Sequence, residues 1–143
     1  MQKLLLLSLP FALLVVVGFQ TATKTTPAAP ADPVIAGFSK STVASVADAV
    51  DQIIGQRGYM NHDMRPIVGT KIVGRAATAL VRPAPAAQAT PALATKHSVE
   101  MIDNAKAGEV GVIIMEGSLD VAAIGGLMGT AAKSRGMAGM VLD

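Results

Sequence analysis

Val110-Gly-Val-Ile-Ile-Met115 is a continuous apolar run, and Ala138-Gly-Met-Val-Leu142 is a second one. Runs of this kind are typical of strands buried on both faces. Between them, residues 120–134 have a helical pattern that Gly136 ends. Strand, helix and strand in succession make a βαβ unit, whose two strands almost always lie parallel. The sequence therefore predicts a compact α/β domain with a parallel or mixed sheet and flanking helices.

Upstream of this unit the sequence predicts two more helices and one or two more strands. Residues 42–54 carry apolar side chains at helical spacing, and Gly55 supplies a left-handed C-cap. Residues 67–81 alternate and then run apolar, which predicts the strands. An Ala/Pro/Gln-rich loop at residues 83–91 leads to a helix expected at about Lys96–Lys106.

The amino terminus has the pattern of a secretory signal peptide. Met1–Lys3 is a short positive segment, and the apolar run Leu4–Phe19 follows it. At ~1.5 Å per residue this run falls short of a ~30 Å hydrocarbon core, which favours a cleaved leader over a membrane span. We expect residues 1–22 to be a signal peptide or anchor, residues 23–36 a Pro/Ala/Thr-rich linker, and residues 37–143 the α/β domain.

Composition and charge exclude several classes of function. Two of the twelve Lys/Arg residues, Lys3 and Lys24, precede Asp32, so ten basic residues face ten acidic ones from there onward. A neutral domain lacks the clustered cations that a nucleic-acid backbone requires, so we expect no nucleic-acid partner. The absence of cysteine excludes disulfides, thiolate nucleophiles and Cys-ligated zinc. We expect an exported protein that meets a membrane only through its N-terminal segment, or a cytoplasmic one if that segment is not a signal.

The best candidate for a binding site is Gly125-Gly126-Leu127-Met128. The two glycines interrupt a helical pattern, so the helix is expected to start afresh near Gly126. The N–H groups of Leu127 and Met128 would then lack intrahelical acceptors and would attract a carboxylate or phosphate. Alternatively, the glycines only allow the helix to pack closely on the sheet, and their spacing does not decide between the two interpretations. The segment matches neither the dinucleotide fingerprint nor the P-loop.

Other polar residues give weaker indications of a site. Glu116 and Asp120 follow a strand and could bind a divalent cation or act as a base. Solvated loop acids, with Asp120 capping the helix, are the better interpretation. His62 lies in a polar turn without metal-ligand spacing, and Arg65 precedes a proline that forces it to be extended, so that it could bind an anion. His97, at the expected start of a helix, has no evident role.

Four segments in order carry a resemblance to a known family. They resemble the 4-hydroxy-4-methyl-2-oxoglutarate aldolases and regulators of ribonuclease activity, a family also labelled demethylmenaquinone methyltransferase-like. The resemblance covers about residues 40–143, and its last segment is the most specific. The segments are Val43-Ala-Ser-Val-Ala-Asp-Ala-Val50, then Gly58-Tyr-Met60 with Met64-Arg-Pro66, then Gly69-Thr-Lys-Ile-Val-Gly-Arg-Ala-Ala-Thr78, and finally Ala107-Gly-Glu-Val110 through Gly125-Gly-Leu-Met128 to Arg135-Gly-Met-Ala-Gly-Met-Val-Leu-Asp143.

The resemblance implies a compact α/β fold that assembles into homotrimers or hexamers with active sites between subunits. Members cleave or decarboxylate 2-oxo acids and release pyruvate with Mg²⁺ or Mn²⁺, which polarises the 2-oxo group and stabilises the enolate. The pyruvate end would be held by Gly125, Gly126, Leu127 and Met128. The expected function is thus a divalent-metal-dependent 2-oxo acid lyase. The alternative is a non-catalytic regulatory protein that binds a ribonuclease, which the apparent export signal disfavours.

Three departures from the family pattern affect this expectation. The family's arginine–aspartate pair, which supplies the catalytic cation and the metal ligand, would fall a few residues after Asp143. We therefore expect a domain truncated at its carboxyl end and inactive as it stands, with no catalytic arginine and no metal ligand among these residues. Many aldolases carry an acid in place of Gly126, and the loop at residues 82–95 does not match the family.

Overall fold

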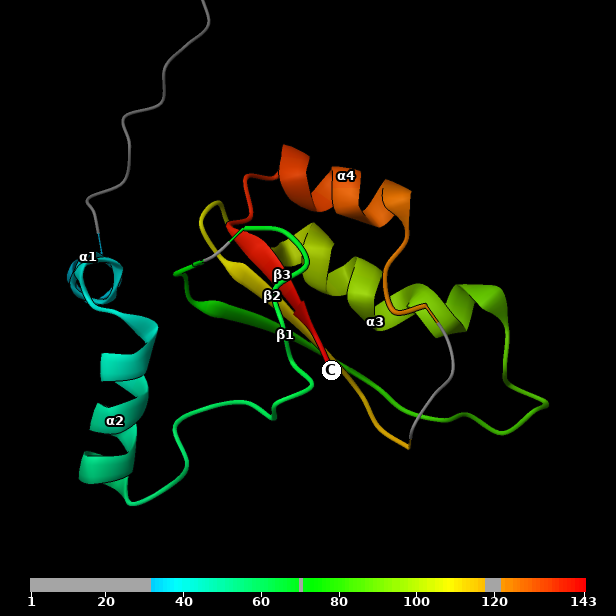
Figure 1. The fold of residues 1–143 in the computed structure, drawn as a ribbon. Coiled ribbons are helices and arrows are strands. Elements are labelled where there is room, and N and C mark those ends of the chain that lie inside the picture. The colour runs from blue at the N-terminus through cyan, green and yellow to red at the C-terminus, as the bar shows by residue number, and fades with distance from the viewer. Residues whose placement is uncertain (1–31, 70, 118–121) are drawn as a thin grey trace, which may run out of the picture.

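The computed structural model describes residues 32–69, 71–117 and 122–143 (Figure 1). In these ranges three parallel strands form one sheet in the order β1-β2-β3, so the predicted α/β fold is confirmed. The strands are Ala76–Val81 (β1), Val110–Met115 (β2) and Gly139–Leu142 (β3), and the helices are Pro33–Lys40 (α1), Val43–Ile54 (α2), Pro91–Asn104 (α3) and Gly126–Ser134 (α4).

The predicted signal peptide and most of the predicted linker lie outside the described residues and stay predictions. In the described ranges no helix has the length and apolar character needed to span a bilayer.

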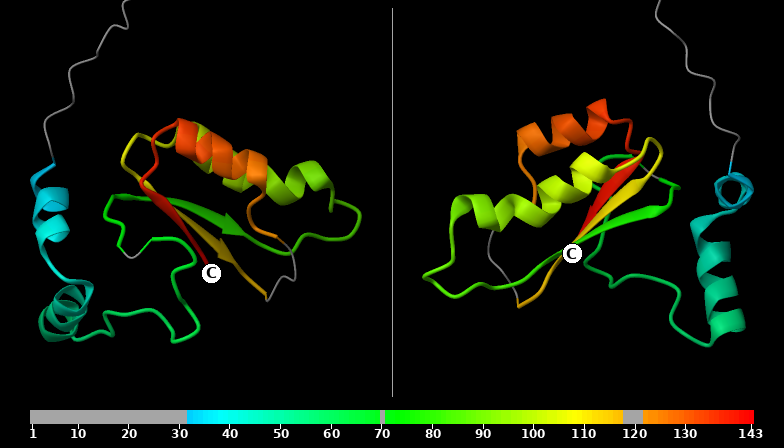
Figure 2. Two further views of the ribbon diagram at one scale, coloured as in Figure 1. Left: turned by 45° about the horizontal axis from the view of Figure 1, so that its top comes forward. Right: turned by 180° about the vertical axis from the view of Figure 1, so that it is seen from behind.

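Two βαβ units share the central strand β2. Helix α3 connects β1 to β2 and α4 connects β2 to β3, and both helices cover the same face of the sheet (Figures 1 and 2). Successive crossovers of one hand along one direction of a sheet produce this arrangement. The unit predicted from the two apolar runs is confirmed, with Val110 opposite Gly139 and Ile113 opposite Leu142 in parallel register.

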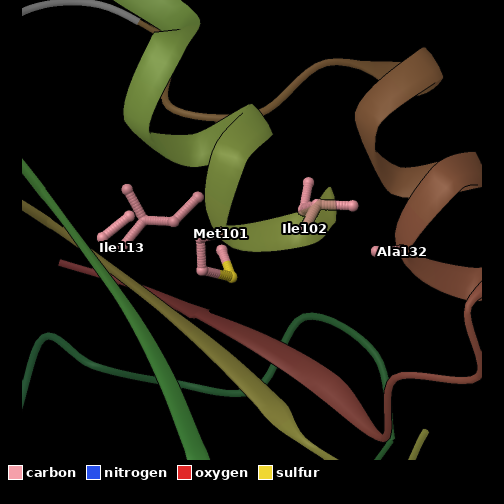
Figure 3. Packing of buried hydrophobic residues seen from close by; sticks show 5 residues of the cluster. Met101, Ile102, Ile113 and Ala132 are labelled. Atoms are coloured by element: carbon pink, nitrogen blue, oxygen red, sulfur yellow. The ribbon is translucent and has the colours of Figure 1, made fainter. Parts of the chain in front are cut away.

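Side chains between the sheet and the two covering helices form the hydrophobic core (Figure 3). Ile113 of β2 is fully buried, and Ile102 of α3 and Ala132 of α4 are nearly so. Methionine fills the remaining space, since Met140 lies where a side chain at Gly111 would be. Unbranched, polarisable methionines suit such irregular gaps, so the core needs no large aromatic side chain.

The opposite face of the sheet is only partly covered. The segment that precedes β1 crosses this face near the start of the strands, where a Cβ at Gly139 would lie 3.0 Å from Cδ1 of Ile72. Toward the other end of the strands, Leu80 and Ile114 are 38% and 39% exposed. Because parallel sheets generally bury both faces, this surface is suited to contact with a further layer of protein.

Helices α1 and α2 lie beside the sheet and not over it (Figures 1 and 2). The helix predicted at residues 42–54 is confirmed as α2. The hydroxyl of Thr42 caps it by accepting the N–H of Ser45, and Gly55 ends it with φ 68°. These are local signals, which explains why the sequence was sufficient to predict them.

Polar contacts connect α1 to the segment before β1. Asp32 caps α1 by accepting the N–H of Val34, and Nη2 of Arg75 lies 2.7 Å from the same carboxylate. The Val34 N–H and the Arg75 guanidinium lower the pKa of the Asp32 carboxyl below its usual value. At the other end of α1, Nζ of Lys71 donates to the carbonyl oxygen of Ser39 at 2.8 Å. Because α1 starts at Pro33, residues 33–36 of the predicted linker are helical.

Two predictions of secondary structure were wrong at their boundaries. Among the described residues of the range 67–81, only Ala76–Val81 pairs with a neighbouring strand and forms β1. Helix α3 begins at Pro91, five residues before the predicted start at Lys96. The hydroxyl of Thr90 caps this earlier start, and proline is favoured in the first turn of a helix.

The two neighbouring isoleucines of β2 provide a matched test of this packing. We expect Ile113→Ala to lower the free energy of unfolding by about 2–5 kcal/mol, because it leaves a cavity under α3. Ile114→Ala should cost less than about 1 kcal/mol, because that side chain is already partly in water. Urea unfolding followed by circular dichroism measures both values, and equal losses would contradict the assignment of the two faces.

Candidate functional site

Helix α4 begins at the glycine doublet. Gly125 is the N-cap residue, with extended φ −112° and ψ 172°, and Gly126 is the first helical residue. The first intrahelical bond runs from the N–H of Gly129 to the carbonyl oxygen of Gly125 at 3.0 Å. Within the described ranges, the N–H groups of Gly126, Leu127 and Met128 have no hydrogen-bond partner. The predicted restart of the helix is confirmed, whereas the helical pattern assigned to the residues just before the doublet was wrong.

Neither packing nor backbone conformation requires glycine at these two positions. A Cβ at Gly125 or Gly126 would meet no described atom within 4 Å, and neither residue has a positive φ. Gly139 is different, because a Cβ there would press on Ile72. Among the described residues, nothing therefore requires the doublet as a packing spacer. With glycine at both positions, the doublet has no side chain that could cover the N–H groups of the first turn.

Among the described residues, no acceptor competes for the N–H groups of the first turn of α4. No described side chain caps Gly125, and the turn contains no acidic residue. Leu127 is 89% exposed, so the turn faces solvent. The helix dipole adds partial positive charge at this end. Exposed N–H groups and a positive helix end together suit a carboxylate or a phosphate.

The orientation of α4 follows from the chain path. The helix runs from the carboxyl end of β2 back to the start of β3, so its first turn lies on the side where the strands end (Figures 1 and 2). Ala123 and Met128 pack against the core and hold this end of the helix on the sheet. Open parallel sheets bind their ligands at this side, beyond the carboxyl ends of the strands.

At the carboxyl ends of the strands, one charged residue directly follows each of the three strands. They are Arg82, Glu116 and Asp143 in the order of the strands. The Nε of Arg82 donates to Oε2 of Glu116 at 2.6 Å, and its Nη2 donates to Oε1 at 3.3 Å. This bidentate bond raises the pKa of the Arg82 guanidinium. Asp143 continues the ladder, since its carbonyl oxygen accepts the N–H of Met115 at 2.9 Å.

The described residues do not fit a divalent metal ion. Across residues 32–69, 71–117 and 122–143, no three His, Cys, Asp or Glu side chains lie close enough to share one. Glu116, the candidate ligand named from the sequence, is bound by Arg82. Asp120, the second candidate ligand and proposed helix cap, lies outside the described residues.

The two histidines lie away from α4. His62 and Arg65 are exposed in the turn after α2, where the N–H of Met64 donates to the carbonyl oxygen of Asn61 at 3.0 Å. His97 was expected at a helix start, but α3 begins a turn and a half earlier, so this residue lies within the helix. Its Nδ1 lies 3.3 Å from Oε2 of Glu100 on the same exposed surface.

Arg82 is the site residue that sequence reasoning did not single out. In the sequence it is the first residue of a loop that does not match the family pattern. A usable signal was present, because Arg82 follows β1 as directly as Glu116 follows β2. Adjacent parallel strands end side by side, so a cation and a carboxylate at equivalent strand ends are brought together.

Substitution at the cap position separates the two interpretations of the glycine doublet. We expect Gly125→Ser to raise the free energy of unfolding by roughly a few tenths of a kcal/mol, because its hydroxyl accepts a first-turn N–H. Hydrogen exchange at Leu127 or Met128 should slow accordingly. The control Gly129→Ala, one turn later, should stabilise the helix by about 0.5–1 kcal/mol without slowing those amides. A destabilised Gly125→Ser variant would mean that the doublet is needed for packing.

A model of the family described as RraA-like (Aldolase/RraA) matches residues 43–143, from the start of α2 to the end of β3. The match includes the glycine doublet and all three strand ends. No curated protein and no solved structure matches the chain.

Proposed function

This chain belongs to the RraA-like (Aldolase/RraA) family, and on that premise we propose that it binds a small 2-oxo acid at the start of α4 as part of a lyase reaction. The reaction is aldol cleavage, or decarboxylation of oxaloacetate, with release of pyruvate. One observation carries the proposal: α4 starts with N–H groups that have no partner among the described residues, on the side of the sheet where ligands of parallel sheets bind.

The chemistry of the first turn supports a carboxylate as the bound group. A carboxylate presents two acceptor oxygens, and the N–H groups of Leu127 and Met128 are successive donors at the positive end of the helix dipole. The glycines leave the approach to these donors open. The protein atoms thus bind and orient the acid end of the substrate, while its reacting carbon extends away from the helix.

The resemblance also implies Mg²⁺ or Mn²⁺ as a cofactor. In this family the ion supplies Lewis-acid stabilisation of an enolate. The described residues do not form a site for it, so its ligands would come from outside them. Within the described residues, the part assigned to this chain is the binding of the carboxylate.

We further propose self-association and export. The half-exposed side chains of Leu80 and Ile114 support contact between subunits, since a second copy would bury them in a homotrimer or hexamer. Sedimentation equilibrium tests the assembly. Export or membrane tethering rests on the charge and apolar pattern of residues 1–22, and cell fractionation tests it.

A non-catalytic regulatory protein of the ribonuclease-regulator type is the second candidate function. One observation favours it: the Arg82 pair neutralises Glu116, the described carboxylate that sequence analysis had named as a possible base. Such a protein would bind an organic acid as a signal and would not convert it.

Acid binding at α4 is tested by titration with oxalate and pyruvate. We expect the amide NMR signals of Leu127 and Met128 to shift, with a dissociation constant of about 1 mM, or ~4 kcal/mol of binding free energy. Gly125→Asp places a fixed carboxylate on the same donors and should weaken binding at least about tenfold. Gly129→Ala should leave it unchanged. Shifts confined to residues away from α4 would contradict the proposed site.

The lyase reaction is tested on the whole product of the gene. We expect decarboxylation of oxaloacetate that requires Mg²⁺ or Mn²⁺ and is lost on chelation with EDTA. Gly125→Asp should raise the KM because the substrate carboxylate is displaced. Acid binding without metal-dependent turnover would contradict the proposed lyase reaction and favour the regulatory alternative.

A further inference from the structure

A groove separates α3 from the outer edge of β1. It has a volume of about 490 Å³, which is within the range of binding clefts. It is distinct from the start of α4, because none of its lining residues belongs to α4. The lining residues are Ala77, Thr78, Ala79 and Leu80 of β1, His97, Glu100, Met101 and Asn104 of α3, and Ala105 and Glu109 beyond it.

One wall of the groove is the backbone of an edge strand. The sheet order places β1 at the edge, with only β2 beside it among the described strands. The N–H of Val110 donates to the carbonyl oxygen of Arg75, and the N–H of Glu116 donates to that of Val81. Alternation along a strand therefore directs the N–H and C=O groups of Thr78 and Leu80 outward, away from β2.

The sequence of β1 itself lacks several of the usual protections against strand pairing. Natural edges are blocked by charged residues, proline, bulges or very short strands. β1 is a full Ala-Ala-Thr-Ala-Leu-Val strand without any of these. The short side chains of Ala77 and Ala79 leave space beneath α3, where Met101 provides an apolar floor.

The charge of the groove defines its occupant. Among the described residues, Glu100 and Glu109 are the carboxylates that line it, and no lysine or arginine does. Lys96 approaches Glu100 only to 3.9 Å, and Nδ1 of His97, which also lines the groove, lies 3.3 Å from Oε2 of Glu100. All three side chains are about half exposed, so these pairs neutralise Glu100 weakly. Two copies of this edge paired with each other would bring the acidic walls together, which disfavours self-pairing.

We propose that an extended peptide segment of a partner protein, with lysine or arginine at alternate positions, binds in this groove as a fourth strand beside β1. Its backbone pairs with the outward groups of Thr78 and Leu80, and its cationic side chains lie next to Glu100 and Glu109. This is strand addition at a groove between a helix and an edge strand, in which backbone bonds give affinity and side chains give specificity.

The probe is an acetylated and amidated hexapeptide of alternating lysine and valine, with the glutamate–valine hexapeptide as its acidic counterpart. Binding to the full chain is measured by calorimetry. We expect the basic peptide to bind at least tenfold more tightly than the acidic one. Hydrogen exchange at the amides of Thr78 and Leu80 should slow when it is bound. Protection at other residues, or equal affinity for both peptides, would overturn the proposal.

Charge reversal in the groove gives the second arm of the test. Glu100→Lys should lower the affinity for the basic peptide at least tenfold and raise the affinity for the acidic peptide. Glu109→Gln keeps an acceptor for the N–H of Lys106. This variant should lower the affinity for the basic peptide severalfold. Asp48→Lys on α2 makes the same charge change at an exposed position outside the groove and should have no effect. Equal losses for Asp48→Lys and Glu100→Lys would indicate attraction by net charge alone and would overturn the site.

Backbone pairing has its own test. Thr78→Pro removes an outward N–H at an edge position where proline is tolerated and should abolish binding while circular dichroism stays unchanged. If this variant does not fold, hydrogen exchange at the Thr78 amide of the unaltered chain tests the backbone pairing. Slower exchange with peptide bound supports the pairing, and unchanged exchange contradicts it. Concentration-dependent protection of Thr78 without peptide would identify a second copy of the chain as the occupant and would overturn the proposal.

Discussion

Burial of Ile113 beneath α3 and α4 is the packing constraint on which the described domain depends. The side chain projects from the middle strand of the sheet and contributes to the same cluster as Ile102 and Ala132 (Figure 3). Because both crossovers have the same hand and advance in one direction along the sheet, both helices lie on one face and can cover this residue. The result is a sheet with one closed face, one largely open face and two edges.

The same packing positions the candidate site. Helix α4 places Ala132 in the core, and its opposite end then projects over the edge where the strands finish. The N–H groups of the first turn cannot hydrogen-bond within their own helix, and no described side chain caps them. The site therefore consists of backbone N–H groups whose orientation is held by apolar contacts on the other side of the helix. Binding of an anion depends here on helix placement more than on any charged side chain.

The exposed surfaces have a common origin in the small size of the sheet. In the part of the chain that the structure describes, three strands with helices on one face leave Leu80 and Ile114 partly exposed and leave the outer groups of β1 without a partner strand. The two surfaces differ in chemistry. The open face is apolar and suits another layer of protein, whereas the β1 groove combines backbone donors and acceptors with carboxylates. This difference is why one surface is assigned to subunit contact and the other to a basic peptide.

The sequence by itself determined those features that depend on neighbouring residues. Thr42 and Gly55 bound α2, the apolar run from Val110 gives β2, and the doublet at Gly125 starts α4, because caps, runs and breaks act within one or two turns of chain. Only the tertiary structure decided which apolar residues of 67–81 join the sheet, since a strand exists only against a partner strand. It alone brought Arg82 to Glu116 and revealed empty space beside Gly125. Both results depend on contacts between segments distant in the chain, which no local pattern encodes.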